Sequence, residues 1–178
     1  MAVALSDEVR HGLAAHLDAA LDGPLPGRPV PPDNWHITLR FLGDTSQREW
    51  ETLLHRIESG LQIAPFKLGF GSLGAFPKAP RATVLWLGID RGGDELIALA
   101  AVAEEAAADA GFTEEERPFH PHLTLSRIRP HQNVGTLLEQ VPPFPLTQQV
   151  REVVIYRSHL GGAKPARYEV LERLPLGG

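Results

Sequence analysis

The chain has no cysteine, so it forms no disulfide, has no thiolate metal site and has no cysteine nucleophile. It also lacks a long apolar run, because no stretch approaches the roughly 18–20 uninterrupted apolar residues that cross a bilayer. Residues 1–8 have no basic segment and become acidic early, which argues against a signal peptide. We therefore expect a cytoplasmic protein in which residues 1–178 form a single domain.

The chain also lacks a net positive charge. It has 17 Lys and Arg side chains and 22 Asp and Glu side chains, which gives a net charge of −5. This balance argues against a broad nucleic-acid-coating surface. The charge is unevenly distributed: residues 1–116 hold 9 basic and 18 acidic side chains, whereas residues 117–178 hold 8 and 4, a net +4. Either this is chance among solvated side chains, or the second part carries a small anion-binding patch sufficient for one phosphate.

One short pattern occurs twice, as His36-Ile-Thr38 and as His122-Leu-Thr124. Both copies lie in apolar runs typical of strands, residues 35–42 and 119–125. Because strand side chains alternate between faces, each His and its Thr share one face while the middle residue enters the core. Two histidines around one small group can divide acid and base roles, since an imidazole titrates at about 6.5. The pattern predicts hydrolysis or transesterification, with the threonines holding an oxyanion.

Hydrophobic periodicity predicts an α+β protein with mainly antiparallel strands and with helices on the outer faces. The predicted strands cover residues 2–5, 35–42, 66–70, 82–89, 119–125, 150–156 and 168–171. One predicted helix begins after the N-cap Ser6, and a second follows residues 43–46, which end a strand and cap that helix. A third covers 94–110 up to Gly111, and a short helix lies near 133–140. Residues 23–32 and 71–80 are rich in glycine and proline, which predicts loops. The two motifs lie 86 residues apart, about half the chain, which indicates two similar lobes.

The motifs and their flanks, WHITLRFLGD at 35–44 and FHPHLTLSR at 119–127, resemble the signatures of the 2H phosphoesterases. Within that superfamily the chain is most similar to the RNA 2′,3′-cyclic phosphodiesterases, also called 2′-5′ RNA ligases. Residues 73–77, 81–88 and 156–168 add to the likeness. The resemblance implies a bilobal fold of two mainly antiparallel sheets with pseudo-twofold symmetry around a central cleft. The opening strand lacks the bulky aromatic residue common in relatives, which indicates a slightly truncated start.

The resemblance also implies a reaction without metal or cofactor at a terminal 2′,3′-cyclic phosphate of RNA, yielding a 2′-phosphate. His36 would be the general acid that protonates the departing O3′, and His122 the general base that activates water. In ligation an RNA 5′-hydroxyl would replace the water. The other assigned contacts are Thr38 and Thr124 to the non-bridging oxygens, Arg127 to the phosphate and Phe41 to the terminal base. We expect a monomer with no obligate protein partner, because one chain holds the complete set.

A regular strand conflicts with two of these assignments, because it places Phe41 opposite His36 and Arg127 opposite His122. Either the strands end or bend there, as the resemblance implies, or Phe41 is a core residue and Arg127 an exterior one. The residues that strand parity alone nominates are Arg40 and Ser126.

Other interpretations remain open. His120, His122 and His131 suggest a zinc site and hence a metal hydrolase, although no acidic residue or cysteine nearby completes the set. His120 is otherwise expected to be a partly exposed bystander, and Trp86 a core residue rather than a base-stacking platform. The same motifs would also serve a 2H enzyme acting on small cyclic nucleotides or 2′,5′-oligonucleotides. A non-catalytic module that binds RNA ends belongs to a different functional class.

Overall fold

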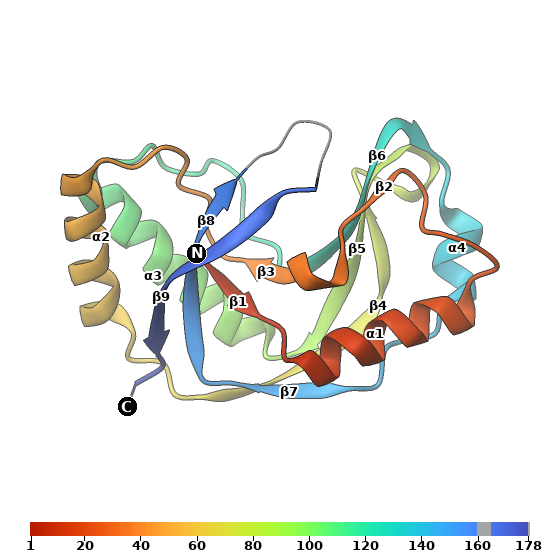
Figure 1. Ribbon diagram of the computed structural model, residues 1–178, viewed down its shortest axis with the longest axis horizontal. Helices are drawn as coiled ribbons and strands as arrows, with labels where there is room; N and C mark the ends of the chain where they lie inside the picture. The colour runs from red at the N-terminus through yellow and green to blue at the C-terminus, as the bar shows by residue number, and fades with distance from the viewer. Residues whose placement is uncertain (160–164, 178) are drawn as a thin grey trace.

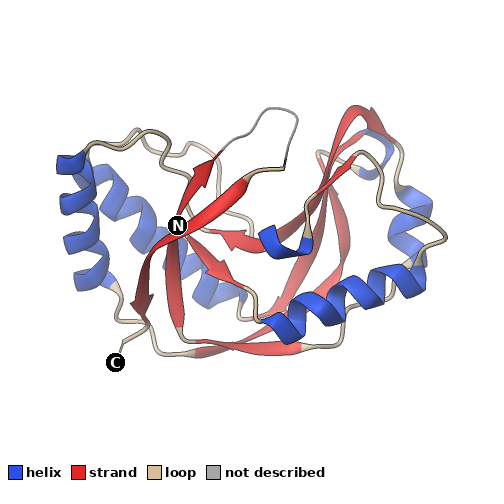
Figure 2. Cartoon of the chain, viewed as in Figure 1, coloured by secondary structure: helices blue, strands red, loops and turns tan. Residues whose placement is uncertain are grey.

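The computed structural model describes residues 1–159 and 165–177, whose strands form two antiparallel sheets (Figures 1 and 2). The strands are β1 Ala2–Ala4, β2 Arg28–Pro29, β3 His36–Thr38, β4 Phe66–Phe76, β5 Ala82–Arg91, β6 His122–Gln132, β7 Thr147–Val150, β8 Glu152–His159 and β9 Arg167–Pro175. One sheet has the order β3-β1-β8-β9, and the other has the order β2-β6-β5-β4-β7. The α+β class and the two antiparallel sheets are therefore confirmed.

The helices are α1 Asp7–Ala20, α2 Gln47–Gly60, α3 Gly93–Ala110 and α4 Gly135–Gln140. Figure 1 shows α2 and α3 beside the four-stranded sheet, whereas α1 and α4 lie beside the five-stranded sheet. Because α1 follows β1 and α3 follows β5, each of these helices crosses to the sheet that does not contain its preceding strand. The two halves of the molecule are thus interleaved along the chain. Among the described residues, no helix is both long and apolar enough to span a membrane.

The helix ends follow the predicted caps. The Ser6 hydroxyl accepts a hydrogen bond from the backbone N–H of Val9, at the start of α1. Ser46 and Glu49 form a reciprocal capping box at the start of α2. Gly111 ends α3 with a φ of +97°, a left-handed conformation that favours glycine.

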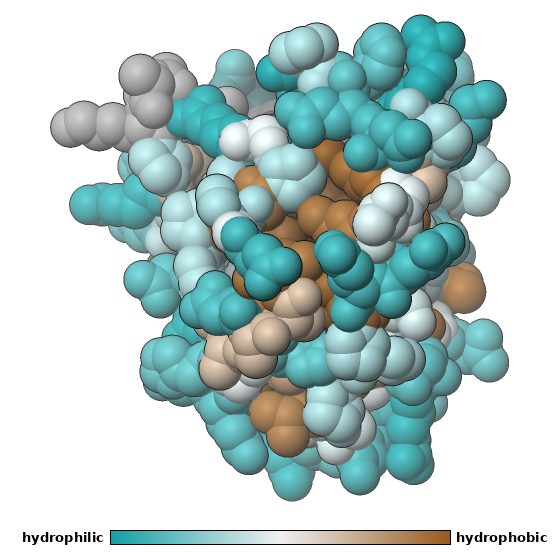
Figure 3. Space-filling view, turned by 90° about the vertical axis from the view of Figure 1, so that its right-hand side faces the viewer, coloured by the Kyte–Doolittle hydropathy of each residue, from teal (hydrophilic) through white to brown (hydrophobic). Residues whose placement is uncertain are grey.

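One hydrophobic core connects the two sheets. Its buried members come from both sheets and from α1, α2 and α3. The middle residues of the two motifs, Ile37 and Leu123, are both 0% exposed and belong to this core. The predicted alternation is therefore confirmed at both motifs. On the side that carries α1 and α4, polar side chains cover most of the surface and leave a strip of apolar ones visible between them (Figure 3).

Both predicted loops are partly wrong. Residues 71–76 belong to β4, because glycine in this segment makes room for a neighbouring ring: a Cβ on Gly74 would lie 2.2 Å from the Trp86 side chain. Residues 28–29 form the edge strand β2, where proline is tolerated because an outward N–H is not needed. Residues 32–34 form a 3₁₀ turn. The motif strands also differ from expectation, since β3 ends at Thr38 and β6 begins only at His122.

Candidate active site

The two motifs lie where the two sheets meet. β3 is the edge of the four-stranded sheet, and it lies against β6 of the five-stranded sheet (Figure 1). His36 and Thr38 flank the buried Ile37 on β3, so both point away from the core. His122 and Thr124 flank the buried Leu123 on β6 in the same way. Each sheet therefore contributes one histidine and one threonine to the junction.

A cleft of about 1160 Å³ opens between the sheets. Four of the predicted site residues line it, namely His36, Thr38, Phe41 and Arg127. Side chains from β8 and β9 also line it, among them Tyr156, Arg157, His159 and Tyr168. His122 and Thr124 do not line the cleft; they lie on the same strand as Arg127, outside the cleft wall. The structure thus gathers the predicted residues at one junction but divides them between the cleft and the sheet beside it.

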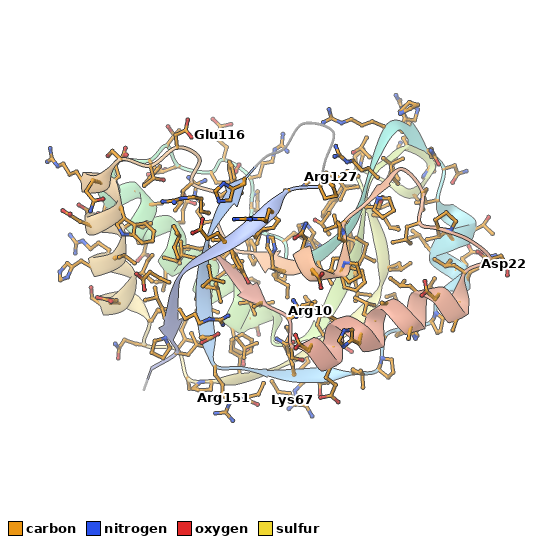
Figure 4. All side chains as sticks on the ribbon, in the orientation of Figure 1. Arg10, Asp22, Lys67, Glu116, Arg127 and Arg151 are labelled. Atoms are coloured by element: carbon orange, nitrogen blue, oxygen red, sulfur yellow. The ribbon has the colours of Figure 1, made fainter. Side chains whose placement is uncertain are left out.

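A β-bulge in β6 decides where Arg127 points. Thr124 pairs with Trp86 and Ser126 pairs with Leu85, so Leu125 is an extra residue without a partner on β5. An extra residue reverses the alternation of faces beyond it. Leu125 and Ser126 are consequently both buried, and Arg127 emerges on the face of His122 and Thr124. In Figure 4 Arg127 lies between the two sheets, which agrees with its place in the cleft wall.

The end of β3 decides the position of Phe41. The strand stops at Thr38, so strand parity no longer applies three residues later. Phe41 is 65% exposed and lines the cleft, and the alternative that it is a core residue is wrong.

Strand alternation alone would assign Arg40 and Ser126 to the site, but both side chains make contacts within the protein. Arg40 pairs with Glu104 of α3, with Nε and Oε2 2.6 Å apart, and donates to the carbonyl oxygens of Phe41 and Thr113. Ser126 is 0% exposed, and its hydroxyl donates to the carbonyl of Pro26. Ser126 is thus closed to a ligand, whereas Arg40 also lines the cleft.

His36 sits against two tyrosine rings that sequence reasoning did not single out. Its ring centroid lies 5.5 Å from that of Tyr156 and 4.7 Å from that of Tyr168, the latter in an edge-on arrangement. Burial lowers the pKa of His36 to about 4, and the nearby N-terminal charge adds to this effect. A hydrogen bond with the backbone of Asn34 opposes it. His36 is therefore neutral at pH 7 in the free protein.

The tautomer of His122 is set by its own chain. Nδ1 lies 2.6 Å from the carbonyl oxygen of His120, so it carries a proton and donates it to that acceptor. Nε2 is then the nitrogen that exchanges a proton with a ligand. Burial lowers the pKa of His122, the hydrogen bond to His120 opposes this, and the charges of His120 and Arg127 lower it further. Two neutral imidazoles with depressed pKa values thus face the junction.

An aromatic cluster surrounds His122, and it corrects the prediction for Trp86. Trp86 is half-buried on the outer face of β5, while its neighbours Leu85 and Leu87 enter the core. The rings of Phe76 and Trp86 lie 5.2 and 6.2 Å from that of His122. Trp86 is therefore not a core residue. Residues 84–88 are all apolar, so the sequence carries no alternation that would have shown this.

The zinc interpretation requires further ligands near His120 and His122. Within residues 1–159 and 165–177, no three His, Asp or Glu side chains are grouped so that they hold a metal ion. The ring of His120 packs instead 5.4 Å from Trp86 and 5.5 Å from Phe76.

Comparison with known proteins places this geometry in a family. The sequence model of the 2′-5′ RNA ligase superfamily matches residues 6–162, which include both His-x-Thr motifs. The chain belongs to this superfamily. The resemblance drawn from the two motifs is thereby confirmed.

Named relatives are similar to this chain in sequence, and a solved structure is similar to it in fold. The RNA 2′,3′-cyclic phosphodiesterase of Escherichia coli K12 is 34% identical over 172 residues, which cover 97% of this chain and 90% of that protein. The RNA 2′,3′-cyclic phosphodiesterase of Aeropyrum pernix is 34% identical over 127 residues, covering 71% and 72%. A crystal structure of E. coli LigT complexed with 3′-AMP superposes with a TM-score of 0.82 at 31% identity, covering 99% of this chain and 96% of that one.

Proposed function

We propose that this protein is an RNA 2′,3′-cyclic phosphodiesterase that opens a terminal cyclic phosphate to a 2′-phosphate. One observation carries the proposal: two His-x-Thr strands from different sheets lie against each other beside one cleft, and a bulge turns Arg127 toward the same junction. The relatives' names give the substrate class, an RNA end with a cyclic phosphate. One chain supplies the whole set, which supports a monomer, and we propose the cytoplasm as its place of action.

The two histidines divide the proton transfers. In-line displacement at phosphorus requires the attacking and leaving oxygens on opposite sides, so the acid and the base must flank the phosphate. His122 takes a proton from water as its oxygen bonds to phosphorus, and His36 gives a proton to O3′ as the P–O3′ bond breaks. The products are a 2′-phosphate and a free 3′-hydroxyl. Each transfer contributes roughly 10²–10⁴-fold to the rate.

The remaining site residues stabilise the negative charge of the phosphate and hold the substrate in position. The hydroxyls of Thr38 and Thr124 donate hydrogen bonds to the non-bridging oxygens, whose negative charge grows in the transition state. The planar guanidinium of Arg127 pairs with two phosphate oxygens at once. Phe41, exposed at the cleft, stacks on the terminal base.

The depressed pKa values fit this mechanism when the substrate is anionic. An imidazolium is stabilised by a nearby negative charge, so the bound phosphate raises the pKa of each histidine. The proton that His36 donates is thus taken up together with the substrate.

We expect kcat/KM to reach its maximum below pH 6.5, the ordinary pKa of histidine. The active form has one protonated and one neutral histidine, and this form is most populated between the two pKa values. Since burial lowers the pKa of both His36 and His122 in the free protein, that interval lies on the acidic side of 6.5. The profile of kcat is expected to lie at higher pH. Initial rates measured across pH 4–9, with circular dichroism to verify folding, test this; a kcat/KM maximum at or above pH 7 contradicts it.

The function itself is tested with a short 5′-hydroxyl RNA that ends in a 2′,3′-cyclic phosphate. The protein is incubated with this RNA in the presence of chelator, and the products are separated against 2′-phosphate and 3′-phosphate standards. We expect a 2′-phosphate. Binding without turnover would favour the RNA-end-binding module, and activity lost to the chelator would favour a metal hydrolase. Turnover of small cyclic nucleotides or 2′,5′-oligonucleotides alone would favour the other 2H activities.

A further inference from the structure

The face of the five-stranded sheet that carries His122 also carries a cluster of aromatic side chains. His122 and Thr124 on β6 pair with Gly88 and Trp86 on β5, and Trp86 pairs with Gly74 on β4. Directly paired residues share a face, so these side chains form one continuous surface. Phe76 lies two residues beyond Gly74 on that surface. The cluster of Phe76, Trp86 and His120 is called the aromatic platform below.

The Trp86 ring lies flat on the sheet, because glycines leave space for it. A Cβ on Gly74 would lie 2.2 Å from the ring, and one on Gly88 would lie 3.3 Å from it. Glycine inside a strand weakens the strand, and it is typical of places where another group approaches the backbone closely. The ring is half-buried, and beside the glycines it contacts the rings of Phe76 and His120.

The aromatic platform is not part of the hydrophobic core. Phe76 and Trp86 are half-buried, His120 is exposed, and none of them belongs to the buried clusters. Their rings contact one another, with centroids 5.2 Å apart for Phe76 and Trp86 and 5.4 Å apart for Trp86 and His120. The platform also touches His122, whose ring lies 5.2 Å from Phe76. It is an aromatic surface next to one histidine, on the side of the sheet that faces away from the core.

The platform contacts His122, and the cleft is lined by His36. His36 and Phe41 line the cleft, whereas His122 and the platform residues do not. In the proposed mechanism His36 serves the leaving O3′, and His122 serves the attacking oxygen. In that mechanism the RNA that carries the cyclic phosphate would occupy the cleft beside His36 and Phe41. The platform lies next to His122, which serves the attacking oxygen. A water molecule gains nothing from an aromatic surface at this place, whereas a nucleoside can stack its base on one.

We propose that the aromatic platform binds the first base of a second RNA strand, whose 5′-hydroxyl attacks the cyclic phosphate in place of water. The inference rests on the proposed function and on the ligation that the family's name describes, and it assigns a binding surface to the second RNA. His122 takes the proton of the 5′-hydroxyl as the new O5′–P bond forms, and His36 protonates O3′ as the P–O3′ bond breaks. The product is a 2′-5′ phosphodiester with a free 3′-hydroxyl. Stacking tolerates any base, because every base has a π-face.

The test separates ligation from hydrolysis in one reaction. RNA with a 2′,3′-cyclic phosphate is incubated with increasing amounts of 5′-hydroxyl RNA, and the ligated and hydrolysed products are quantified. We expect Trp86→Leu to raise the acceptor KM roughly tenfold, the size of a lost base stack, while hydrolysis stays within about threefold of wild type. Trp86→Phe keeps an aromatic ring and should retain ligation. Phe41→Leu is the matched control in the cleft, and it should weaken both reactions equally.

A second acceptor shows whether the base itself is bound. An RNA whose 5′-terminal nucleotide lacks a base should be a roughly tenfold poorer acceptor for wild type, but equal to the normal RNA for Trp86→Leu. Loss of hydrolysis and ligation in the same proportion in Trp86→Leu would overturn the inference, as would a wild type that hydrolyses without ligating at any acceptor concentration. A wild type that does not hydrolyse the cyclic phosphate contradicts the proposed function instead.

Discussion

Replacing either motif histidine by glutamine is expected to lower kcat/KM for the cyclic phosphate RNA by about 10²–10⁴-fold. Glutamine keeps a polar side chain of similar length but cannot carry a proton between pH 5 and 9. His36→Gln removes the acid for O3′, and His122→Gln removes the base that accepts a proton at Nε2. Initial rates with RNA bearing a 2′,3′-cyclic phosphate measure both effects.

The double variant distinguishes a coupled pair from two independent contributions. Residues that act as one unit lose little more together than separately, so His36→Gln/His122→Gln should be about as slow as the slower single variant. His55 is exposed on α2 and provides the matched control, since His55→Gln should leave the rate unchanged. Activity retained in either single variant, with the fold intact by circular dichroism, would show that the histidines are not the acid and the base.

Local sequence signals were sufficient to predict the positions of the site residues that lie inside regular strands. The spacing of His36 and Thr38 places them on one face wherever the strand is extended, and burial of Ile37 fixes which face that is. The same holds for His122 and Thr124. Helix caps are equally local, because a cap needs only the residues of the first or last turn.

The rest of the site depends on contacts between strands, which one sequence does not display. The extra residue at Leu125 becomes visible only when β6 is paired with β5, and without it Arg127 would point away from His122. The glycines of 71–76 have the composition of a loop, but they form strand because the Trp86 ring occupies the space of the missing side chains. Packing across the sheet overrode the local signal in both cases.

Arg127→Ala is expected to lower kcat/KM by about 10²-fold, the size typical for one lost donor to a charge that develops in the transition state. Arg129 is the matched control, because it is the next exposed side chain of β6 and carries the same charge. Arg129→Ala should change the rate little, whereas Arg127→Lys should recover only part of it, since an ammonium does not reproduce the two-pronged contact of a guanidinium.

The comparison of these variants separates local geometry from overall charge. Both arginines contribute to the basic excess of residues 117–178, so a general attraction of RNA predicts equal losses for Arg127→Ala and Arg129→Ala, mostly in KM and mostly at low salt. A direct contact with the reacting phosphate predicts a loss confined to Arg127, mostly in kcat and little changed by salt. Steady-state kinetics at two ionic strengths decide between them. Equal losses would mean that the bulge at Leu125 directs Arg127 toward the cleft without giving it a role in the chemistry.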